Sequence, residues 1–517
     1  MQEQALRELS AVGIDLGTTY STLAIVDKHG QPHIVPNAEG ERLTPSAVFF
    51  DQDSIVVGQI AKDAMVTHPE RVVTFIKRQM GNGAWYYTYK GERQTPVDVS
   101  AHILKKLKQD AEQQLGRDLP FAVITVPAYF DDARRRMTKS AGELAGFQVL
   151  ELLNEPTAAG IAFGIDKIQK PETALVYDLG GGTLDVTIMR VDGKNVRVLA
   201  TDGDHNLGGK DFDDLLMKYV ADHFTREHGN DPTLDPFVAS ELRATAEKAK
   251  RELSARPKAM LMLRGDGKTT RIEVQREQFQ ELIKPKLDTT LTIVRSALKA
   301  AKCEPAQIDR ILLIGGSTRV PAVRALLQNY FGKEPDVSVN PDEAVGLGAA
   351  IMAAKIFAEL KPEIVPQRVK EKTGDLVITD VTSHSFGIEA VRPGTQEKIN
   401  SILIPRNSPI PTQVSKEFIT SLSGQTAIRV KVYQGEFSDI AMVNPIGEFT
   451  LSGLPPDRPA GRKIRVTMSC DKNGVVNITA LDIETGKEAT TEVSYQVGMS
   501  VAQKSAKSKW HNAQKVE

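Results

Sequence analysis

Val12–Val26 reads VGIDLGTTYSTLAIV, and Val176–Met189 reads VYDLGGGTLDVTIM. In each stretch an apolar strand runs into an aspartate, turns through glycine and threonine, and returns as a second apolar strand. Glycines in such turns allow backbone N–H groups to approach a ligand closely, and threonine hydroxyls add further donors. Two units of this kind predict a duplicated fold with a cleft between its halves, in which the two turns wrap a polyphosphate.

Asp15 and Asp178 occupy the same position in the two units. Carboxylates at the ends of facing strands are placed to hold a magnesium ion through its water ligands. The alternative is that each turn is an ordinary hairpin turn, since these favour glycine and aspartate. Two turns in one register make that alternative weaker than it would be for one turn alone.

A third glycine turn, Ile314–Pro321 (IGGSTRVP), follows the predicted strand Arg310–Ile314 and opens a helix near Pro321. This geometry suits a nucleotide at a helix N-terminus. The alternative is a strand–helix connection in which the glycines only permit tight packing.

The composition excludes several classes of protein. The chain has 517 residues, more than one hydrophobic core usually supports, so two or more domains are expected. A net charge of −1 excludes a nucleic-acid partner held by bulk electrostatics. Cys303 and Cys470 lie far apart without metal-ligand spacing, which argues against a disulfide scaffold or a zinc site. With neither a signal peptide nor a membrane span in the sequence, we expect a cytoplasmic protein without a membrane partner.

Two patterns divide the chain. From Val12 to about Ala358, short apolar strands such as Phe121–Val126 alternate with helical patterns such as Asp132–Gly146 and Glu343–Leu360, which predicts an α/β domain. Beyond a boundary rich in proline and charge, strand alternation replaces helical periodicity up to about Val497, which predicts a second, all-β domain of sandwich type.

Seven motifs then carry a resemblance to a known family. They are GIDLGTTYS (Gly13–Ser21), VPAYFDDARR (Val126–Arg135), NEPTAAG (Asn154–Gly160), DLGGGTLDV (Asp178–Val186), LGGKDFD (Leu207–Asp213), EKAKRELS (Glu247–Ser254) and GGSTRVP (Gly315–Pro321). With these motifs in family order, the chain resembles the seventy-kilodalton heat-shock chaperones, the DnaK family, over nearly its whole length.

The resemblance implies a multidomain fold. An α/β actin-like ATPase domain with duplicated ribonuclease-H-like halves would occupy residues 1–372, a hydrophobic linker 373–383, a β-sandwich peptide-binding domain 384–497, and a short tail or the start of a truncated helical lid 498–517. It also implies an ATP-dependent chaperone, in which ATP binding and hydrolysis control the binding and release of extended hydrophobic segments of unfolded proteins.

The resemblance also implies a nucleotide site with ATP or ADP, Mg²⁺ and, as an option, K⁺. The implied catalytic residues are Lys77, Glu155, Asp178, Thr183, Asp185 and Asp15, with Asp15 and Asp178 as the metal residues. The implied nucleotide-binding residues are Gly17, Thr18, Thr19, Tyr20, Gly180, Gly181, Gly182, Thr183, Gly208, Gly209, Glu247, Lys250, Arg251, Ser254, Gly315, Gly316, Ser317, Arg319 and Asp342. For Lys77 and for the helical face of Glu247, Lys250 and Ser254, a solvated surface is the structural alternative.

Two further residue sets follow from the same resemblance. The implied peptide-binding residues are Ile388, Val391, Phe418, Ser421, Ile428, Val430 and Ile464. For any one apolar residue among them, a place in the hydrophobic core of the sandwich is the default expectation. The implied interdomain coupling residues are Pro127, Arg135, Leu376, Val377, Ile378 and Asp380.

The partners implied are unfolded or extended polypeptide clients, a J-domain co-chaperone and a nucleotide-exchange factor. Three features depart from the family. Glu151 stands where main members carry an arginine used by J-domain partners, Ser383, His384 and Phe386 replace Pro, Leu and Leu after the linker, and the chain leaves room for one helix after the β domain. These differences indicate a specialised, divergent member.

Two other classes of function remain as alternatives. Small-molecule kinases of the actin-like fold share the duplicated phosphate turns, but they have no use for a β domain or for the linker Asp375–Val381 (DLVITDV). A scaffold protein with an inactive site is the second alternative, and the presence of Lys77, Glu155, Asp178 and Thr183 argues against it.

Overall fold

The computed structural model describes residues 10–164, 170–336, 338, 340–492 and 501–517. They form two compact units: the first comprises Met1–Ala128, Thr138–Ile378 and Val501–Glu517, and the second comprises Tyr129–Met137 and Thr379–Ser500. The domain boundaries drawn from the sequence stay predictions. Residues 1–9 and the predicted end of the β domain at Val497 lie outside the described residues.

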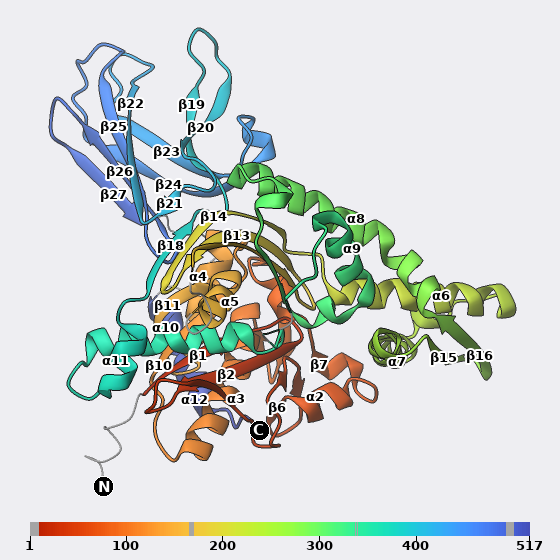
Figure 1. Ribbon diagram of the computed structural model, residues 1–517. Helices are drawn as coiled ribbons and strands as arrows, with labels where there is room; N and C mark the ends of the chain where they lie inside the picture. Colours follow the sequence, from red (N-terminus) through yellow and green to blue (C-terminus); the bar gives the residue numbers. More distant parts are fainter. Residues whose placement is uncertain (1–9, 165–169, 337, 339, 493–500) are drawn as a thin grey trace. The chain divides into compact units, whose positions relative to one another are not determined.

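The first unit contains two sheets built on the same plan (Figure 1). In one, β1 (Ala11–Asp15) runs parallel to β10 (Phe121–Val126) and antiparallel to β2 (Tyr20–Val26). In the other, β12 (Glu172–Leu179) runs parallel to β17 (Arg310–Ile314) and antiparallel to β13 (Leu184–Asp192). The repeated arrangement confirms the predicted duplicated α/β fold. Further strands of these sheets are β3 (Pro32–Val35), β4 (Thr44–Pro45), β11 (Gln148–Asn154) and β14 (Asn195–Asp204).

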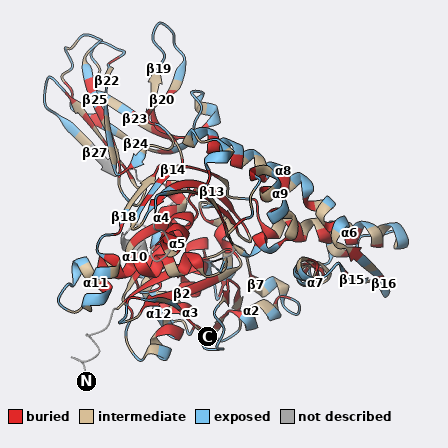
Figure 2. Cartoon of the chain, in the orientation of Figure 1, coloured by how far each residue is buried: buried red, intermediate tan, exposed pale blue. Residues whose placement is uncertain are grey.

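Two helices pack closely between the sheets. They are α5 (Glu155–Gly164) and α10 (Ala344–Leu360), and both are almost entirely buried (Figure 2). Glycines permit this approach: a Cβ on Gly348 would lie 1.8 Å from the carbonyl oxygen of Ala158, and one on Gly13 would lie 2.0 Å from the backbone nitrogen of Ala350. The glycine and alanine content of α10 therefore serves backbone-to-backbone packing.

The remaining elements of the first unit flank these sheets. On the side of the first sheet lie β5 (Val48–Phe50), β6 (Ile55–Val57), α2 (Gln59–Ala64), η1 (Pro69–Arg71), β7 (Val72–Val73), η2 (Ile76–Gln79), β8 (Tyr87–Tyr89), β9 (Glu92–Gln94), α3 (Pro96–Leu115), α4 (Asp132–Leu144, part of it in the second unit) and α12 (Val501–Ala513). Another group of elements in the first unit packs together in one hydrophobic cluster. Its main members are α6 (Gly209–His228), α7 (Pro236–Ala255), β15 (Lys258–Gly265), β16 (Lys268–Gln275), α8 (Arg276–Ala301) and α9 (Pro321–Phe331). Short connecting elements are η3 (Pro232–Leu234), η4 (Pro305–Gln307), η5 (Gly316–Arg319) and α11 (Gln367–Thr373).

The second unit is a β sandwich, as the alternating sequence pattern predicts. One sheet has the order β20-β19-β23-β24 and the other β22-β25-β26-β27. Alternate residues such as Ile464, Val466 and Met468 are buried between the sheets. The strands of these two sheets are β19 (Phe386–Val391), β20 (Lys398–Ile404), β22 (Thr412–Ile419), β23 (Ala427–Gln434), β24 (Asn444–Ser452), β25 (Lys463–Cys470), β26 (Val476–Asp482) and β27 (Glu488–Glu492), with η6 at Ile440–Met442. Outside them, β18 (Val377–Val381, which begins in the first unit) pairs with β21 (Pro409–Ile410).

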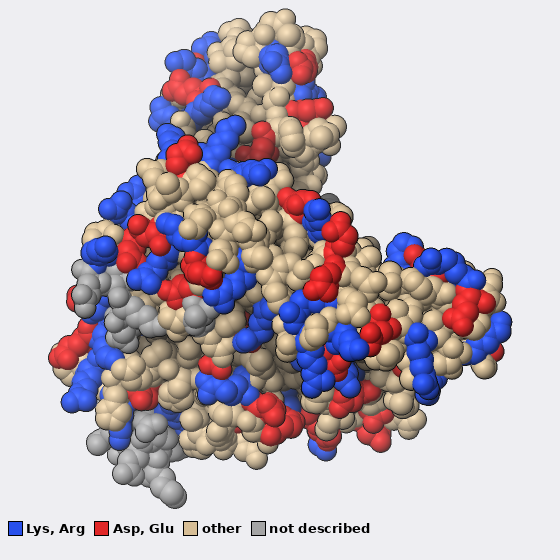
Figure 3. Space-filling view, turned by 45° about the vertical axis from the view of Figure 1, so that its right-hand side comes forward, with Lys and Arg blue, Asp and Glu red and all other residues tan. Residues whose placement is uncertain are grey.

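Acidic and basic side chains alternate over the surface. On the face drawn in Figure 3, blue and red residues are interspersed and no large field of one sign appears. This agrees with the net charge of −1. Within the residues that the structure describes, no helix combines the length and apolarity that crossing a bilayer requires.

The close approach of α10 to α5 yields a stability prediction. Replacing Gly348 by alanine should destabilise the first unit by about 1–3 kcal/mol, because the new Cβ collides with backbone atoms that have no room to move. Urea unfolding followed by tryptophan fluorescence measures this, since Trp85 and Trp510 both belong to the first unit. Leu360→Ala, at the exposed end of the same helix, is the control and should change stability by less than about 0.5 kcal/mol. Equal stability of the two variants would contradict this packing.

Candidate functional site

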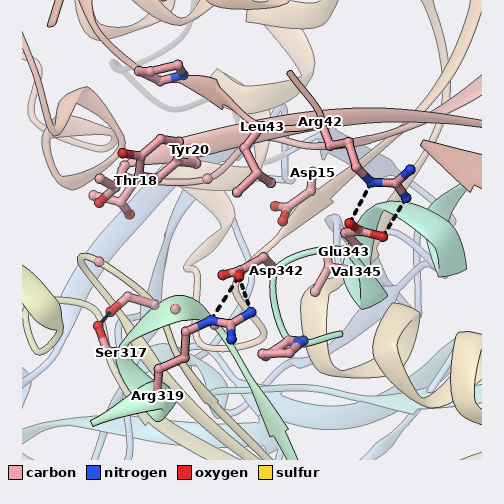
Figure 4. Close-up of a pocket in the computed structure, with 18 of the residues that line it drawn as sticks. Asp15, Thr18, Tyr20, Arg42, Leu43, Ser317, Arg319, Asp342, Glu343 and Val345 are labelled. Carbon is pink, nitrogen blue, oxygen red and sulfur yellow. Dashed lines mark hydrogen bonds and ion pairs between the residues drawn. The ribbon is translucent and has the colours of Figure 1, made fainter. Parts of the chain in front are cut away.

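A cavity of about 1230 Å³ lies within the first unit, lined by residues from both of its sheets (Figure 4). It brings together most of the residues that the sequence predicts for the nucleotide site: Asp15, Gly17, Thr18, Thr19, Tyr20, Lys77, Glu155, Asp178, Gly180, Gly181, Thr183, Glu247, Lys250, Arg251, Ser254, Gly315, Gly316, Ser317, Arg319 and Asp342. The four other predicted residues, Gly182, Asp185, Gly208 and Gly209, lie directly behind this lining.

The two glycine–threonine turns face each other in direct contact at the wall of the cavity, and facing turns are what the sequence predicts. A Cβ on Gly181 would lie 1.8 Å from Thr19 Oγ1, and one on Gly182 would lie 2.5 Å from Thr18 Cγ2. Only glycine therefore fits in the second turn opposite the threonines of the first. Gly208 backs the second turn, where a Cβ would lie 2.6 Å from the carbonyl carbon of Gly181.

Charged groups are buried between the two turns. Lys77, on η2, forms an ion pair with Glu155 at the start of α5, and both side chains are less than a tenth exposed. Burial opposes the charge of Lys77, but the carboxylates of Glu155 and Asp15 outweigh it and raise the pKa of the ammonium. Lys77 is therefore buried, and the alternative that it is a solvated lysine on the surface is wrong.

Two aspartates flank this ion pair. Burial, reinforced by repulsion from Glu155, raises the pKa of Asp15 to about 7. Burial and the neighbouring carboxylates Glu155 and Asp185 raise the pKa of Asp178 well above its usual range. Asp185 pairs directly with Asp178 across β12 and β13. The site therefore carries more buried carboxylates than the Lys77 ammonium neutralises, which is an arrangement that suits an added cation.

The same carboxylates bear on how a metal ion could bind. Among the described residues, no group of three or more His, Cys, Asp or Glu side chains stands close enough to hold a metal ion. Oxygen donors at longer range, with waters and phosphate oxygens between, are the arrangement that Mg²⁺ accepts at nucleotide sites. The donor set thus fits a hydrated magnesium ion that enters with a polyphosphate.

The far part of the cavity is formed by α7 and the third glycine turn. Gly315 has φ of 82°, and a Cβ there would lie 2.5 Å from the carbonyl oxygen of Leu179, so the turn requires glycine. Ser317 Oγ donates to the carbonyl of Gly180 at 2.8 Å, which joins this turn to the second phosphate turn. Arg319 forms an ion pair with Asp342 at 2.6 Å, drawn in Figure 4. Glu247, Lys250 and Ser254 of α7 all line the cavity and are half-buried.

The structure adds residues that the sequence analysis missed. Arg42 donates twice to Glu343 at 2.7 Å beside the cavity, although the two lie 301 positions apart in sequence. Lys62 Nζ donates to Glu247 at 2.7 Å and to the Tyr20 hydroxyl at 3.0 Å. Neither contact has a local sequence signal, because each joins segments that only the fold brings together.

The predicted linker lies partly against the first unit. Leu376 is buried in the core around α10, with Ile378 packed against that core, while the side chain of Val377 is exposed. The N–H of Val377 donates to the carbonyl of Lys194 at 3.0 Å, and Lys194 pairs with Asp375 at 3.4 Å.

Of the other predicted coupling residues, Pro127 belongs to the first unit and Arg135 and Asp380 belong to the second. Asp380 belongs to β18 and is opposite Ile410 of β21 in the second unit. Pro127 is buried directly after β10. The buried Arg135 donates to the carbonyl of Phe130 at 3.1 Å. Glu151 is buried within β11 rather than exposed.

The residues predicted to bind peptide lie at different depths in the sandwich. Ile388, Val430 and Ile464 are buried in its core, and Phe418 and Ile428 are half-buried against that core. Phe418 lies directly opposite Ile464 on the neighbouring strands β22 and β25. Val391 and Ser421 are exposed.

Comparison with known proteins agrees with this architecture. A sequence model of the Hsp70 protein family matches residues 11–86 and 82–516. The protein named "Chaperone protein DnaK" of Thermotoga petrophila is 44% identical over 492 residues, which are 93% of this chain and 80% of that protein. Those of Thermosipho africanus and Thermosipho melanesiensis are 44% and 42% identical over 490 residues, covering 93% of this chain and 79% and 80% of the relatives.

The raised pKa of Asp15 predicts a pH-dependent stability in protein free of nucleotide and metal. A buried carboxyl that takes up its proton near pH 7 binds more protons when folded than when unfolded, so its contribution to stability is lost as the pH rises from about 4 to 7. Asp15→Asn should therefore raise Tm by about 2–5 °C at pH 8 and by much less at pH 5. The exposed Asp53→Asn is the control, and Tm is measured by thermal unfolding in EDTA. An equal change of Tm at both pH values would contradict the assignment.

Proposed function

The chain belongs to the Hsp70 family, and from this premise we propose how its residues carry out the function of an ATP-dependent molecular chaperone. The protein is an ATPase of that family. The observation that carries the proposal is the buried Lys77–Glu155 ion pair, set between two glycine–threonine turns that face each other.

The phosphates of ATP bind between the two turns. Thr18 and Thr19 offer hydroxyl and backbone donors from the first turn, and Thr183 does so from the second. Lys77 positions the γ-phosphate and the attacking water, while Glu155 and Asp185 orient that water. Because the transition state of phosphoryl transfer spreads charge over several oxygens, catalysis rests on placing positive charge and donors around it.

Asp15 and Asp178 would hold Mg²⁺ through its waters, and the site would also admit K⁺. When bound, the metal supplies positive charge for the phosphates and for the surplus carboxylates. The adenosine lies against the third glycine turn and α7, where Lys250 is held by Asp213 at 2.8 Å and by the carbonyl of Gly209 at 3.0 Å.

Nucleotide state reaches the linker through the hairpin of β13 and β14. Thr183 stands at the start of β13, and Lys194, whose carbonyl accepts from Val377, lies in the turn between β13 and β14. One rigid hairpin thus contacts phosphate at one end and the linker at the other. We propose that ATP favours the bound position of the linker, which makes peptide affinity and ATP hydrolysis reciprocal.

The β sandwich of the second unit binds extended hydrophobic segments of unfolded polypeptides. Main-chain hydrogen bonds give such binding its tolerance of sequence, and an apolar pocket selects one side chain. Phe418 and Ile464, opposite each other on adjacent strands, are the residues that we propose to form this pocket.

A cytoplasmic location, a J-domain co-chaperone and a nucleotide-exchange factor complete the proposal. Glu151, at which the family resemblance implies a J-domain contact, is buried in β11, so the co-chaperone is proposed from the family and not from this residue.

The proposed role of Lys77 predicts a loss of hydrolysis without a loss of folding. Lys77→Ala and Thr183→Ala should each lower the single-turnover rate of ATP hydrolysis by about 10²–10³-fold, because each removes a charge or donor at the transferred phosphate. The exposed Lys28→Ala is the matched control and should keep the wild-type rate. A Lys77→Ala variant that hydrolyses ATP within twofold of wild type would overturn the role.

Coupling predicts that nucleotide changes peptide affinity. Anisotropy of a labelled, leucine-rich extended peptide should show weaker binding with Mg-ATP than with ADP, by about tenfold or more. Leu376→Asp should abolish this difference, because a charge cannot occupy the buried linker position, while binding with ADP stays intact. Glu363→Ala, an exposed change just before the linker, is the control. Equal affinity with both nucleotides in the wild type would contradict coupling, and no binding with either would contradict the peptide site.

A further inference from the structure

The placement of Lys77 depends on the short helix that carries it. Lys77 is the second residue of η2 (Ile76–Gln79), a 3₁₀ helix of four residues. A helix of this length is not stable by itself, so contacts to other elements must fix its position. The ion pair of Lys77 with Glu155 is one such contact. Phe75 and Arg78, at the two ends of η2, make further contacts within the first unit.

Arg78 ties η2 to the second phosphate turn. Its Nε donates to the carbonyl of Gly182 at 2.9 Å, directly before Thr183. Its Nη1 and Nη2 donate to the two carboxylate oxygens of Asp211, at 3.4 and 2.5 Å. The Arg78 side chain is mostly buried, with 11% of it exposed. Because a planar guanidinium offers its donors in a fixed arrangement, Arg78 sets both the distance and the angle between η2 and the turn.

The two partners of Arg78 belong to one hydrogen-bonded assembly. Asp211 caps α6 by accepting from the N–H of Gly208 at 2.7 Å. The N–H of Gly209, at the start of the same helix, donates to the carbonyl of Gly180 in the second phosphate turn at 3.0 Å. The phosphate turn and the first turn of α6 are therefore joined, and Arg78 attaches the helix of Lys77 to both.

Phe75 attaches the other end of η2 to the same region. Its φ of 56° is left-handed, a conformation that residues other than glycine seldom adopt. Lys210 Nζ of α6 lies 5.8 Å from the centre of the Phe75 ring, and Arg243 Cζ of α7 lies 5.9 Å from it, both within cation–π range. Contacts to α6 thus hold η2 on both sides of Lys77.

We propose that Arg78 is a positioning residue for ATP hydrolysis, which fixes the Lys77 ammonium relative to Thr183. The inference rests on the proposed function, in which Lys77 and Thr183 act on the transferred phosphate. Arg78 itself does not line the cavity, so it acts through the placement of Lys77 and not on the nucleotide. A displacement of about 1 Å in a catalytic group can lower a rate by about 10²-fold, which is large enough for a positioning residue to matter.

Arg78→Lys tests the proposal, because it keeps the positive charge but loses the fork that reaches Gly182 and Asp211 together. We expect single-turnover hydrolysis to be at least about tenfold slower, while the Kd of Mg-ATP stays within about threefold of wild type. Asp211→Asn should slow hydrolysis in the same direction, since it removes the charge that holds Arg78 and keeps an oxygen for the N–H of Gly208.

The matched control is Arg71→Ala. Arg71 also lies on a short 3₁₀ helix, η1, and forms an ion pair with Asp51 at 3.2 Å, but it does not line the cavity. This variant should keep the wild-type rate. Hydrolysis by Arg78→Lys within twofold of wild type would overturn the positioning role. Loss of Mg-ATP binding together with hydrolysis would also overturn it, because the effect would then not be confined to Lys77.

A double variant separates positioning from a general structural role. If Arg78 acts only through Lys77, then Lys77→Ala/Arg78→Lys should hydrolyse ATP within about twofold of Lys77→Ala alone, because no ammonium remains to be placed. A further loss as large as that of Arg78→Lys in the wild-type background would show that Arg78 acts independently, and it would overturn the proposal.

The proposed function and the role of Arg78 fail in different ways. A wild-type protein that does not hydrolyse ATP would contradict the proposed function itself. A wild-type protein that hydrolyses ATP no faster than Arg78→Lys does would overturn only the positioning role.

Discussion

The ammonium of Lys77 is the group on which the proposed nucleotide site depends. It is buried among Asp15, Glu155 and Asp178, carboxylates that come from β1, α5 and β12 and would repel one another without it. Burial of like charges costs free energy, and on the proposed function a magnesium nucleotide offsets that cost when it binds. The cluster joins residues from both halves of the first unit, so the proposed nucleotide site depends on the geometry between these halves.

The phosphate turns could be predicted from sequence because their chemistry is local. An aspartate at a strand end followed by glycine and threonine specifies a turn, and its repetition specifies a pair of facing turns. The alternation of apolar residues, as in Ile464, Val466 and Met468, likewise predicts a strand with one buried face. Contacts such as Arg42–Glu343 could not be predicted, because no sequence pattern links two charged residues that are 301 positions apart. The sequence allowed residues 498–517 to form one short helix or a frayed tail. The structure has a helix at Val501–Ala513, where His511 contacts the buried Asp98 and His102.

The hairpin of β13 and β14 connects the two regions that an ATP-dependent chaperone must couple. Its first residues adjoin the phosphate turn at Thr183, and its turn at Lys194 accepts a hydrogen bond from the linker. Since a paired β hairpin is stiff, we propose that a small change at the phosphate end shifts the turn at Lys194. Leu376 is buried in the core around α10, which holds the start of the linker against the first unit.

Amide hydrogen exchange at Val377 is the most direct test of this account, because its N–H is bonded to the carbonyl of Lys194. Exchange is measured in the wild type with Mg-ATP and with Mg-ADP, under conditions where hydrolysis is slow relative to labelling. The account predicts clearly slower exchange with Mg-ATP, since the linker is then held against the hairpin. Equal exchange with the two nucleotides would mean that the charge cluster and the linker do not communicate, and it would contradict the central claim.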